Sequence, residues 1–262
     1  MIGFDMLATE LLLGERQALI QERLERSGRV IAAELAQELA VSEDTIRRDL
    51  REMAAAGLCR RVYGGALPVS PASGSLSERM AIGTERKQAL ARASISFIEP
   101  GSTIFLDAGS TNLAIAQALP EDRDLTVATN APSIAATLID RSGVDIIQIG
   151  GQVDKKVGGA IGAKAMRDAE ALRPDLCILG VCGIDRDAGV TAYSFEDAEF
   201  KRFLAQRSRA VLVAVTSDKL STAAAYAVIP LSSVSCAVFE ADADEQEVAA
   251  YASAGLRILR AQ

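Results

Sequence analysis

The 262-residue sequence contains no histidine. This absence removes the Ser-His and Cys-His pairs of nucleophilic catalysis, histidine-ligated metals and the most common general base. Carboxylates and lysines remain as possible catalytic groups, so enzymatic activity becomes less expected without being excluded. We expect no catalytic residues, no metal and no other cofactor.

Cysteine and long apolar runs are also scarce. The four cysteines, Cys59, Cys177, Cys182 and Cys236, show no metal-ligand spacing and are predicted to be buried and reduced. No apolar run approaches the roughly eighteen residues of a membrane-spanning helix, and the first residues lack the basic segment and cleavage site of a secretory signal. We therefore predict a cytoplasmic protein with no membrane partner.

Positive charge is in deficit, with 28 Lys and Arg against 35 Asp and Glu, a net charge of −7. This balance has the wrong sign for a protein that coats nucleic acid indiscriminately. DNA binding would have to depend on a local basic surface. Residues 45–61 provide one, with five arginines against Asp49 and Glu52: Arg47, Arg48, Arg51, Arg60 and Arg61.

The basic segment begins with VSEDTIRRDL, residues 41–50, which predicts a short amphipathic helix that ends at Gly57. Ser42 is the expected N-cap, because its hydroxyl can accept a hydrogen bond from a free backbone N–H. Glu43 and Asp44 lie four residues ahead of Arg47 and Arg48, a spacing that favours two ion pairs.

One face of this predicted helix is apolar and the opposite face is basic. Ile46, Leu50 and Met53 repeat at helical spacing and form a stripe that should be buried. Arg48 points away from the stripe, Arg47 and Arg51 flank it, and Thr45 lies on the other flank. Such a helix fits the DNA major groove, although a charged outer face by itself is more often simply solvated.

The surrounding elements favour DNA binding. Helices are expected at 15–27 and 31–40, and a tight turn at residues 41–42 leads into the basic helix, which is the order of a helix-turn-helix. A strand at 58–62 and a turn at 63–65 predict a two-stranded wing that carries Arg60 and Arg61 over phosphate. The alternative is a small three-helix domain that binds nothing.

The remainder of the chain predicts an α/β domain with a largely parallel sheet, because continuous apolar runs alternate with amphipathic helices. Strands are expected at 103–107, 125–129, 144–150, 175–181, 210–215 and 234–240, with helices at 86–97, 111–119 and 131–140. The predicted organisation is an extension at 1–14, a DNA-binding domain at 15–68, a Pro/Ser/Gly-rich linker at 69–80, and an effector-binding and oligomerisation domain at 81–262.

Several loops follow predicted strands, where ligands bind in sheets of this type. Asp107 to Thr111 precedes a helix and offers backbone N–H groups and two hydroxyls to an anion. The candidate effector contacts in these loops are Asp107, Gly109, Ser110, Thr111, Thr129, Asn130, Gly150 and Gly151. Lys219, after the strand 210–215, could supply a positive charge to a phosphate, or could be an ordinary surface lysine.

The N-terminal segment resembles the winged helix-turn-helix domain of the DeoR family of bacterial transcriptional regulators. The resemblance rests on about fifty residues that include Glu15-Arg16, Gly28-Arg29-Val30, TIRRDL at 45–50 and RRVYGGA at 60–66. In that family the TIRRDL helix reads DNA. The DNA-contact candidates, drawn from this helix and the following hairpin, are Ser42, Thr45, Arg47, Arg48, Arg51, Arg60, Arg61 and Tyr63.

The segment from about Arg86 to Glu240 resembles the sensor half of DeoR-type regulators, which is similar in fold to ribose-5-phosphate isomerase and glucosamine-6-phosphate deaminase. The resemblance implies a pocket for a phosphorylated sugar, to which Asp197 and Lys219 also belong. Two positions depart from the family pattern. The family's Asp-Ser-Ser-Lys is Thr216-Ser217-Asp218-Lys219 here, and Asp197 stands where Glu is common.

These observations predict a regulator, more often a repressor than an activator in this family, of sugar-metabolism genes. Its expected partners are double-stranded operator DNA, a phosphorylated sugar effector and further copies of itself in a homodimer or homotetramer. One alternative is a sugar-phosphate isomerase or deaminase with a DNA-binding appendage, in which Asp107, Glu196, Asp197 and Lys219 supply acid/base groups. Another is a DNA binder whose α/β half serves only oligomerisation.

Overall fold

The computed structural model describes residues 12–27, 30–62, 64–68 and 75–262. The chain forms two compact units, Met1–Ser70 and Pro71–Gln262. Tyr63, one of the predicted DNA contacts, lies outside the described residues, as do most of the predicted N-terminal extension and residues 69–74 of the predicted linker.

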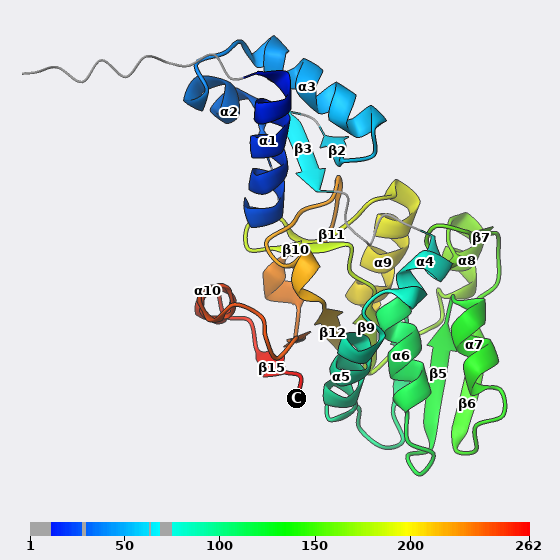
Figure 1. Cartoon of the computed structure of the whole chain (residues 1–262). Coiled ribbons are helices and arrows are strands. Elements are labelled where there is room, and N and C mark those ends of the chain that lie inside the picture. Colours follow the sequence, from blue (N-terminus) through cyan, green and yellow to red (C-terminus); the bar gives the residue numbers. More distant parts are fainter. Residues whose placement is uncertain (1–11, 28–29, 63, 69–74) are drawn as a thin grey trace, which may run out of the picture. The chain divides into compact units, whose positions relative to one another are not determined.

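The N-terminal unit has the three predicted helices and the predicted hairpin in order, with one additional short strand (Figure 1). Its helices are α1 (Leu13–Ser27), α2 (Ala32–Glu38) and α3 (Glu43–Ala55), and its strands are β1 (Val30–Ile31), β2 (Cys59–Val62) and β3 (Gly65–Pro68). The strands form an antiparallel sheet of order β1-β3-β2. The unit is therefore a helix-turn-helix followed by a β-hairpin.

The apolar stripes of the three helices converge on one small core. Ile20 and Leu24 of α1, Leu35 of α2, and Ile46 and Leu50 of α3 are each at most 2% exposed. Complete burial of such a side chain stabilises a fold by about 1.5–3 kcal/mol. The stripe on α3 therefore fixes which face of this helix is turned to solvent.

The two-residue strand β1 was not expected from the sequence, and Gly65 explains how it fits. Ile31 pairs with Gly65 in the sheet, and a Cβ atom at Gly65 would lie 1.9 Å from the Val30 carbonyl oxygen. A residue with a side chain would push β1 away from β3. The glycine thus permits the close backbone approach that joins the hairpin to the helices.

The C-terminal unit is built on a seven-stranded sheet of order β15-β14-β12-β9-β4-β5-β6, in which every pair is parallel. The prediction of a largely parallel α/β sheet is confirmed. The strands are β4 (Thr103–Leu106), β5 (Leu125–Thr129), β6 (Val144–Gln148), β9 (Leu176–Leu179), β12 (Ala210–Val215), β14 (Cys236–Phe239) and β15 (Ile258–Arg260). Only β15, which has three residues, was not predicted.

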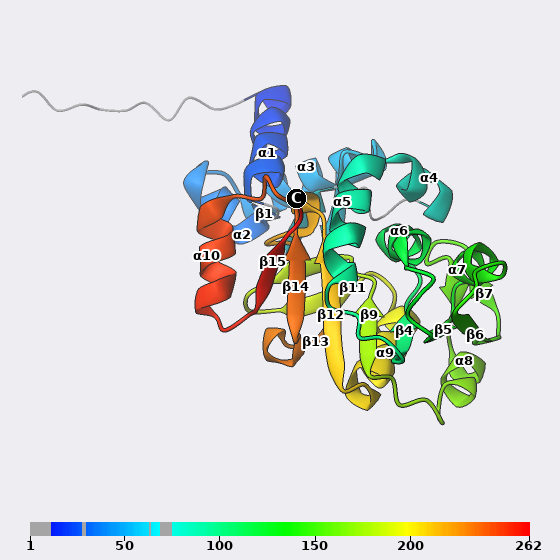
Figure 2. The same ribbon diagram turned by 90° about the horizontal axis from the view of Figure 1, so that it is seen from below.

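Helices cover both faces of this sheet (Figure 2). One face carries α5 (Thr84–Ile95), α6 (Ser110–Ala118) and α7 (Pro132–Leu138), and the other carries α8 (Ala163–Asp168), α9 (Phe195–Arg207) and α10 (Glu245–Ser253). Successive side chains of β4 alternate between the two cores: Ile104 and Leu106 face the first, whereas Phe105 meets Phe200 edge-on, with ring centroids 6.0 Å apart. This double burial explains the continuous apolar runs.

Several small elements surround the main sheet. A hairpin joins β7 (Val153–Asp154) to β8 (Gly159–Ala160), and a second antiparallel sheet contains β10 (Gly183–Asp185), β11 (Gly189–Ala192) and β13 (Tyr226–Ile229). Single 3₁₀ turns follow β12 and β13 at Ser217–Lys219 and Leu231–Ser233. Among the described residues, no helix is both long and apolar enough to cross a membrane.

The predicted linker at 69–80 is wrong in its last part, because helix α4 occupies Leu76–Ala81. Ser75 accepts a hydrogen bond from the Glu78 backbone N–H, and the Glu78 carboxylate accepts one from the Ser75 N–H. This capping box satisfies two backbone donors that would otherwise be free. The Ser-x-x-Glu spacing was present in the sequence, but the neighbouring Pro, Ser and Gly residues concealed it.

Candidate DNA-binding surface and ligand cavity

The N-terminus of α3 has the predicted capping arrangement. The Ser42 hydroxyl accepts a hydrogen bond from the Thr45 backbone N–H at 3.1 Å, and the two side-chain oxygens lie 2.8 Å apart. Both hydroxyls therefore lie together at the start of the helix, where backbone N–H groups and the helix dipole favour a negatively charged partner.

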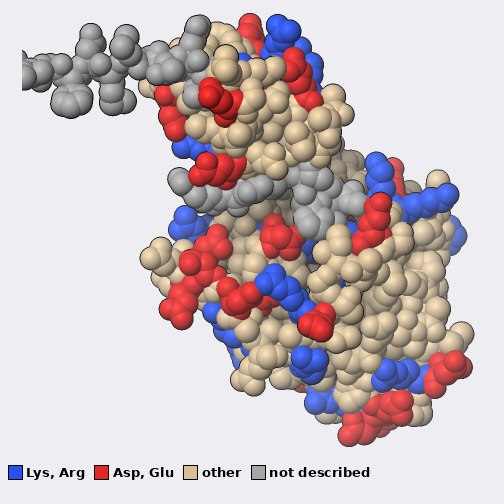
Figure 3. Space-filling view, in the orientation of Figure 1, with Lys and Arg blue, Asp and Glu red and all other residues tan. Residues whose placement is uncertain are grey.

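Arg47, Arg48 and Arg51 form the outer side of α3, here called the arginine face. The Arg48 side chain is 76% exposed and that of Arg47 is 50% exposed. In the space-filling view, basic and acidic side chains lie next to each other over the part of the unit that α3 forms (Figure 3). The predicted orientation of the helix, apolar side inward and arginines outward, is confirmed.

The ion pairs on the arginine face differ in part from those expected. Arg47 pairs with Glu43 at 2.7 Å as predicted, but Arg48 pairs with Glu52, one turn further on, at 3.3 Å instead of with Asp44. Exposed pairs of this kind contribute only about 0–1 kcal/mol. The guanidinium groups can therefore exchange these carboxylates for DNA phosphates or bases at little cost.

A buried ion pair anchors α3 from behind. Asp49 is 2% exposed, and Arg16 of α1 donates to both of its carboxylate oxygens, at 2.7 and 3.2 Å. Asp49 therefore does not offset the charge of the arginine face as the sequence suggested. Its carboxylate fixes the position of α3 relative to α1.

The hairpin after α3 carries the other predicted DNA contacts. Arg60 and Arg61 lie in β2, opposite Leu67 and Ala66 of β3, and the Arg61 side chain is exposed. The Arg60 side chain is not among the parts that the structure describes. The backbone register thus confirms a two-stranded wing, while the DNA contacts themselves remain predictions.

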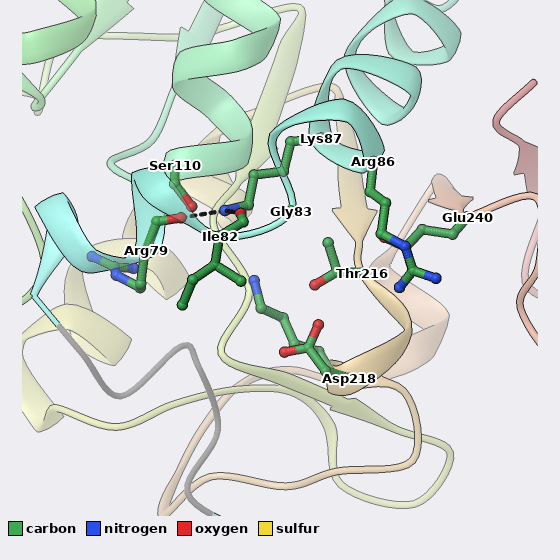
Figure 4. A pocket seen from close by; sticks show the side chains of 10 residues that line it. Arg79, Ile82, Gly83, Arg86, Lys87, Ser110, Thr216, Asp218 and Glu240 are labelled. Atoms are coloured by element: carbon green, nitrogen blue, oxygen red, sulfur yellow. Dashed lines mark hydrogen bonds and ion pairs between the residues drawn. The ribbon is translucent and has the colours of Figure 1, made fainter.

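A cavity of about 200 Å³ lies in the C-terminal unit where α4, α5 and α6 meet the loops after β12 and β14. Figure 4 shows the side chains around it. The lining includes four cations, two carboxylates and several small or apolar groups: Arg79, Arg86, Lys87, Lys219, Asp218, Glu240, Ile82, Gly83, Ser110 and Thr216. The excess of cations favours an anionic ligand. This space is called the ligand cavity below.

Ser110 and Lys219 are the two predicted effector residues that line the ligand cavity. Ser110 is the first residue of the nine-residue helix α6. Among the described residues, the Lys219 ammonium has no hydrogen-bond or ion-pair partner, and burial lowers the pKa of this lysine. A half-buried cation without a partner, in the same cavity as a helix N-terminus, suits a phosphate group.

The other cations of the cavity already have partners. Arg86 forms ion pairs with Glu240 at 3.2 Å and with Asp242. The Lys87 ammonium, which is buried, donates to the Arg79 and Ile82 carbonyl oxygens. Their charges add to the field that an anion would meet, while Lys219 is left to bind it directly.

Asp107 and Asp197 were expected to contact the effector, but both are buried and neither lines the ligand cavity. The Lys201 ammonium lies 3.2 Å from the Asp107 carboxylate and donates to Asp197, and Asp107 also accepts from the Gly180 N–H at 2.9 Å. Burial raises the pKa of Asp107. These three charged side chains, here called the buried triad, anchor the loop after β4.

Thr129 and Asn130 also support this loop and do not line the cavity. The Thr129 hydroxyl donates to the Leu106 carbonyl, and the Asn130 amide accepts from the Ala108 N–H and donates to the Ala160 carbonyl. Both residues are completely buried. Their hydrogen bonds hold Asp107 to Ser110 in position through the backbone.

The remaining predicted effector residues lie near the same sheet edge but outside the cavity lining. Gly109 precedes α6, and the Thr111 hydroxyl is buried without a hydrogen-bond partner in the described structure. Gly150 and Gly151 follow β6 and lie beside α8. The structure thus brings Ser110 and Lys219 together in the cavity lining and leaves these four residues outside it.

Sequence reasoning missed the residues from the α4–α5 corner, Arg79, Arg86 and Lys87, and also Glu240. Three of them are ordinary charged residues in a helical segment, and their convergence depends on how α5 packs against α6. Glu240 follows the apolar strand β14 and stands at its carboxyl end. A charged residue at that position was the one available signal.

Comparison with known proteins covers both units. Residues 16–72 match the DeoR-like helix-turn-helix domain and residues 83–241 match the DeoR C terminal sensor domain. The chain is 36% identical over 201 residues to the glycerol-3-phosphate regulon repressor of Escherichia coli (strain K12), covering 76% of this chain and 80% of that protein. It is 26% identical over 252 residues to a putative aga operon transcriptional repressor of Escherichia coli O157:H7, covering 94% and 93%.

Among solved structures, ribose 5-phosphate isomerase A from Methanocaldococcus jannaschii aligns with a TM-score of 0.39 and 11% identity, over 52% of this chain and 54% of that one. The family matches and the two units define a DNA-binding transcriptional regulator with a separate sensor domain. The chain belongs to the DeoR family. The named relatives are repressors, which supports a regulator and does not favour the isomerase or deaminase alternative.

Proposed function

We propose that this regulator represses sugar-metabolism genes and that a phosphorylated sugar, bound in the ligand cavity, controls its affinity for operator DNA. The observation that carries the effector class is the Lys219 ammonium, which has no partner in the described structure and shares a cation-rich cavity with Ser110 at the start of α6. The names of the relatives, a glycerol-3-phosphate regulon repressor and an aga operon repressor, support the gene class.

The sugar part of the ligand would meet the carboxylates of the same cavity. Asp218 and Glu240 line it and can accept hydrogen bonds from hydroxyl groups. Asp218 directly precedes Lys219, whereas the family pattern has its acid three residues before the lysine. Hydroxyl recognition should therefore differ from that of relatives, while phosphate recognition is retained.

On the DNA side, the arginine face would enter the major groove and the hairpin would contact the backbone. The assigned contacts, on α3 and the wing, are Ser42, Thr45, Arg47, Arg48, Arg51, Arg60, Arg61 and Tyr63. One such helix covers a single half-site, so we assign a homodimer or homotetramer, which presents two helices to paired half-sites. Because a repressor of this kind acts on the chromosome, we also propose a cytoplasmic location.

Titration calorimetry tests the effector site directly. Glycerol 3-phosphate, ribose 5-phosphate and glucose 6-phosphate are compared with the unphosphorylated compounds. We expect at least one phosphate to bind far more tightly than its parent compound, because charge-assisted hydrogen bonds are roughly twice as strong as neutral ones.

Two variants locate the site. Ser110→Asp places a carboxylate where the phosphate is proposed to lie and should abolish binding, and Lys219→Ala should weaken it strongly. Ser232→Asp, an exposed site in the same unit, is the matched control and should bind normally. Without ligand, all three variants should bind a DNA duplex selected from random sequence with the affinity of the parent protein. Tight binding of an unphosphorylated sugar, insensitive to both variants, would refute this site.

A further inference from the structure

The wall of the ligand cavity includes the first described part of the C-terminal unit. Five of the ten lining residues lie between positions 79 and 87: Arg79, Ile82, Gly83, Arg86 and Lys87. This segment is the end of α4, the two-residue corner and the start of α5. Along the chain, α4 is the first described element after the DNA-binding unit. A ligand in this cavity therefore touches the segment that leads to the DNA-binding unit.

Helix α4 is held by few contacts. None of its six residues is buried. Its Leu76 side chain packs on Gly158 of the β7–β8 loop, so closely that a Cβ atom at Gly158 would lie 2.5 Å from Leu76 Cδ2. Arg79 donates to the Lys156 and Val157 carbonyls of the same loop, at 2.6 and 3.0 Å. Because so little apolar surface is buried, modest forces can change the docking of α4.

Three cations meet at this corner. The Lys87 ammonium donates to the Arg79 and Ile82 carbonyls at the end of α4. Burial lowers the pKa of Lys87, and the nearby Lys219 and Arg79 charges lower it further. Without a ligand, these three cations repel one another. An anion bound to Lys219 lowers this repulsion, and it meets the charges of Arg79 and Lys87 only while α4 is docked.

From this arrangement we infer that α4 and the α4–α5 corner form the switch element of the regulator. Phosphate binding holds α4 against the β7–β8 loop, and this docking of α4 controls the affinity of the regulator for DNA. The inference rests on the proposed ligand site and adds the element on which the ligand acts.

Hydrogen–deuterium exchange of the full chain, with and without inorganic phosphate, tests the switch. Amides of residues 76–88 should exchange about tenfold more slowly with phosphate, the size of a typical coupling between sites. Gly158→Ala should abolish the slowing, since its Cβ collides with Leu76 and its backbone φ of +84° strains any other residue. Gly101→Ala, with a φ of +71° and open space around it, has the same strain without the collision and should behave as the parent.

A second variant and a second measurement guard against a simple folding defect. Leu76→Ala removes the same contact without backbone strain and should also lose the slowing. The phosphate-dependent change in affinity for a selected DNA duplex should be at least fivefold in the parent and in Gly101→Ala, and below about twofold in Gly158→Ala and Leu76→Ala.

The possible failures are distinct. If phosphate binds the parent but leaves residues 76–88 unchanged, or slows them equally in Gly158→Ala and Leu76→Ala, α4 is not the switch element and the ligand site stands. If calorimetry shows that neither phosphate nor any sugar phosphate binds the parent, the proposed effector site and this inference both fail.

Discussion

The buried triad allows a sharp test of how the C-terminal unit is stabilised. Lys201→Met removes the ammonium and leaves the Asp107 and Asp197 carboxylates facing each other at 0–2% exposure. Breaking a buried ion pair in this way costs about 3–5 kcal/mol, because the remaining charge has no compensation. Lys164→Met is the matched control, since Lys164 makes the same i,i+4 pair with Asp168 on an exposed surface and should cost under about 1 kcal/mol.

Urea unfolding of the full chain, followed by circular dichroism, measures this difference. With a slope of about 2 kcal/mol per M urea, the transition of the C-terminal unit should move down by about 2 M in Lys201→Met. Asp107→Asn should shift it much less, because the triad carries one excess negative charge and the asparagine oxygen can still accept from the Gly180 N–H. Equal losses in Lys201→Met and Asp107→Asn would show that packing, and not charge, determines the stability of this cluster.

The pH dependence gives an independent check. Burial raises the pKa of Asp107 above its usual 3.8 even beside Lys201, and removal of the ammonium should raise it further. A carboxyl group whose pKa is raised by folding contributes to the free energy of unfolding in full below about pH 3.8, and this contribution is lost as the pH rises through the folded-state pKa. The deficit of Lys201→Met relative to the parent should therefore shrink as the pH falls from 7 towards 4. A deficit that is constant over this range would contradict the reasoning.

Three further predictions follow from the two surfaces. In salt-dependent gel shifts, Arg48→Ala should weaken binding to specific DNA by about 1–3 kcal/mol and relax the preference at one base pair, whereas Arg61→Ala should weaken binding to specific and random DNA alike. Equal losses of affinity for specific and random DNA in Arg48→Ala would show that Arg48 does not read a base. Arg16→Ala leaves Asp49 buried without its partner and should lower the stability of the N-terminal unit by about 3 kcal/mol in urea unfolding. Burial lowers the pKa of Lys219, so calorimetry above pH 7 should show phosphate affinity falling as pH rises through that pKa; constant affinity would remove Lys219 from the site.

Helix α3 could be predicted almost completely from the sequence because its determinants are local. The Ser42 cap acts within three residues, and the buried stripe follows from helical periodicity. The choice of Glu52 over Asp44 as the partner of Arg48 was not predictable, because both carboxylates stand four residues from the arginine. Both carboxylates satisfy the same i,i+4 rule, so residue spacing alone does not select one of them.

Only a small part of the ligand cavity was predictable, since two of its ten lining residues were among the predicted effector contacts. Ser110 and Lys219 follow the ends of parallel strands, and topology brings such positions to one edge. Asp107 follows the same rule, yet its partner Lys201 lies in α9, more than ninety positions later, and that pairing removes Asp107 from the cavity surface. The rule for sheet edges indicates which loops form a site, but tertiary pairing decides which side chains in those loops face the ligand.

The two surfaces use their cations in opposite ways. On α3 the guanidinium groups are exposed and held by pairs that contribute at most about 1 kcal/mol, and salt screens their interactions beyond roughly 8 Å. In the cavity, Lys87 is buried and Lys219 half-buried, so an anion there is attracted with less screening from solvent and ions. The affinity for DNA should consequently fall steeply as the salt concentration rises, while the affinity for phosphate changes little. The ligand can therefore act over a range of ionic strength in which the affinity for DNA varies.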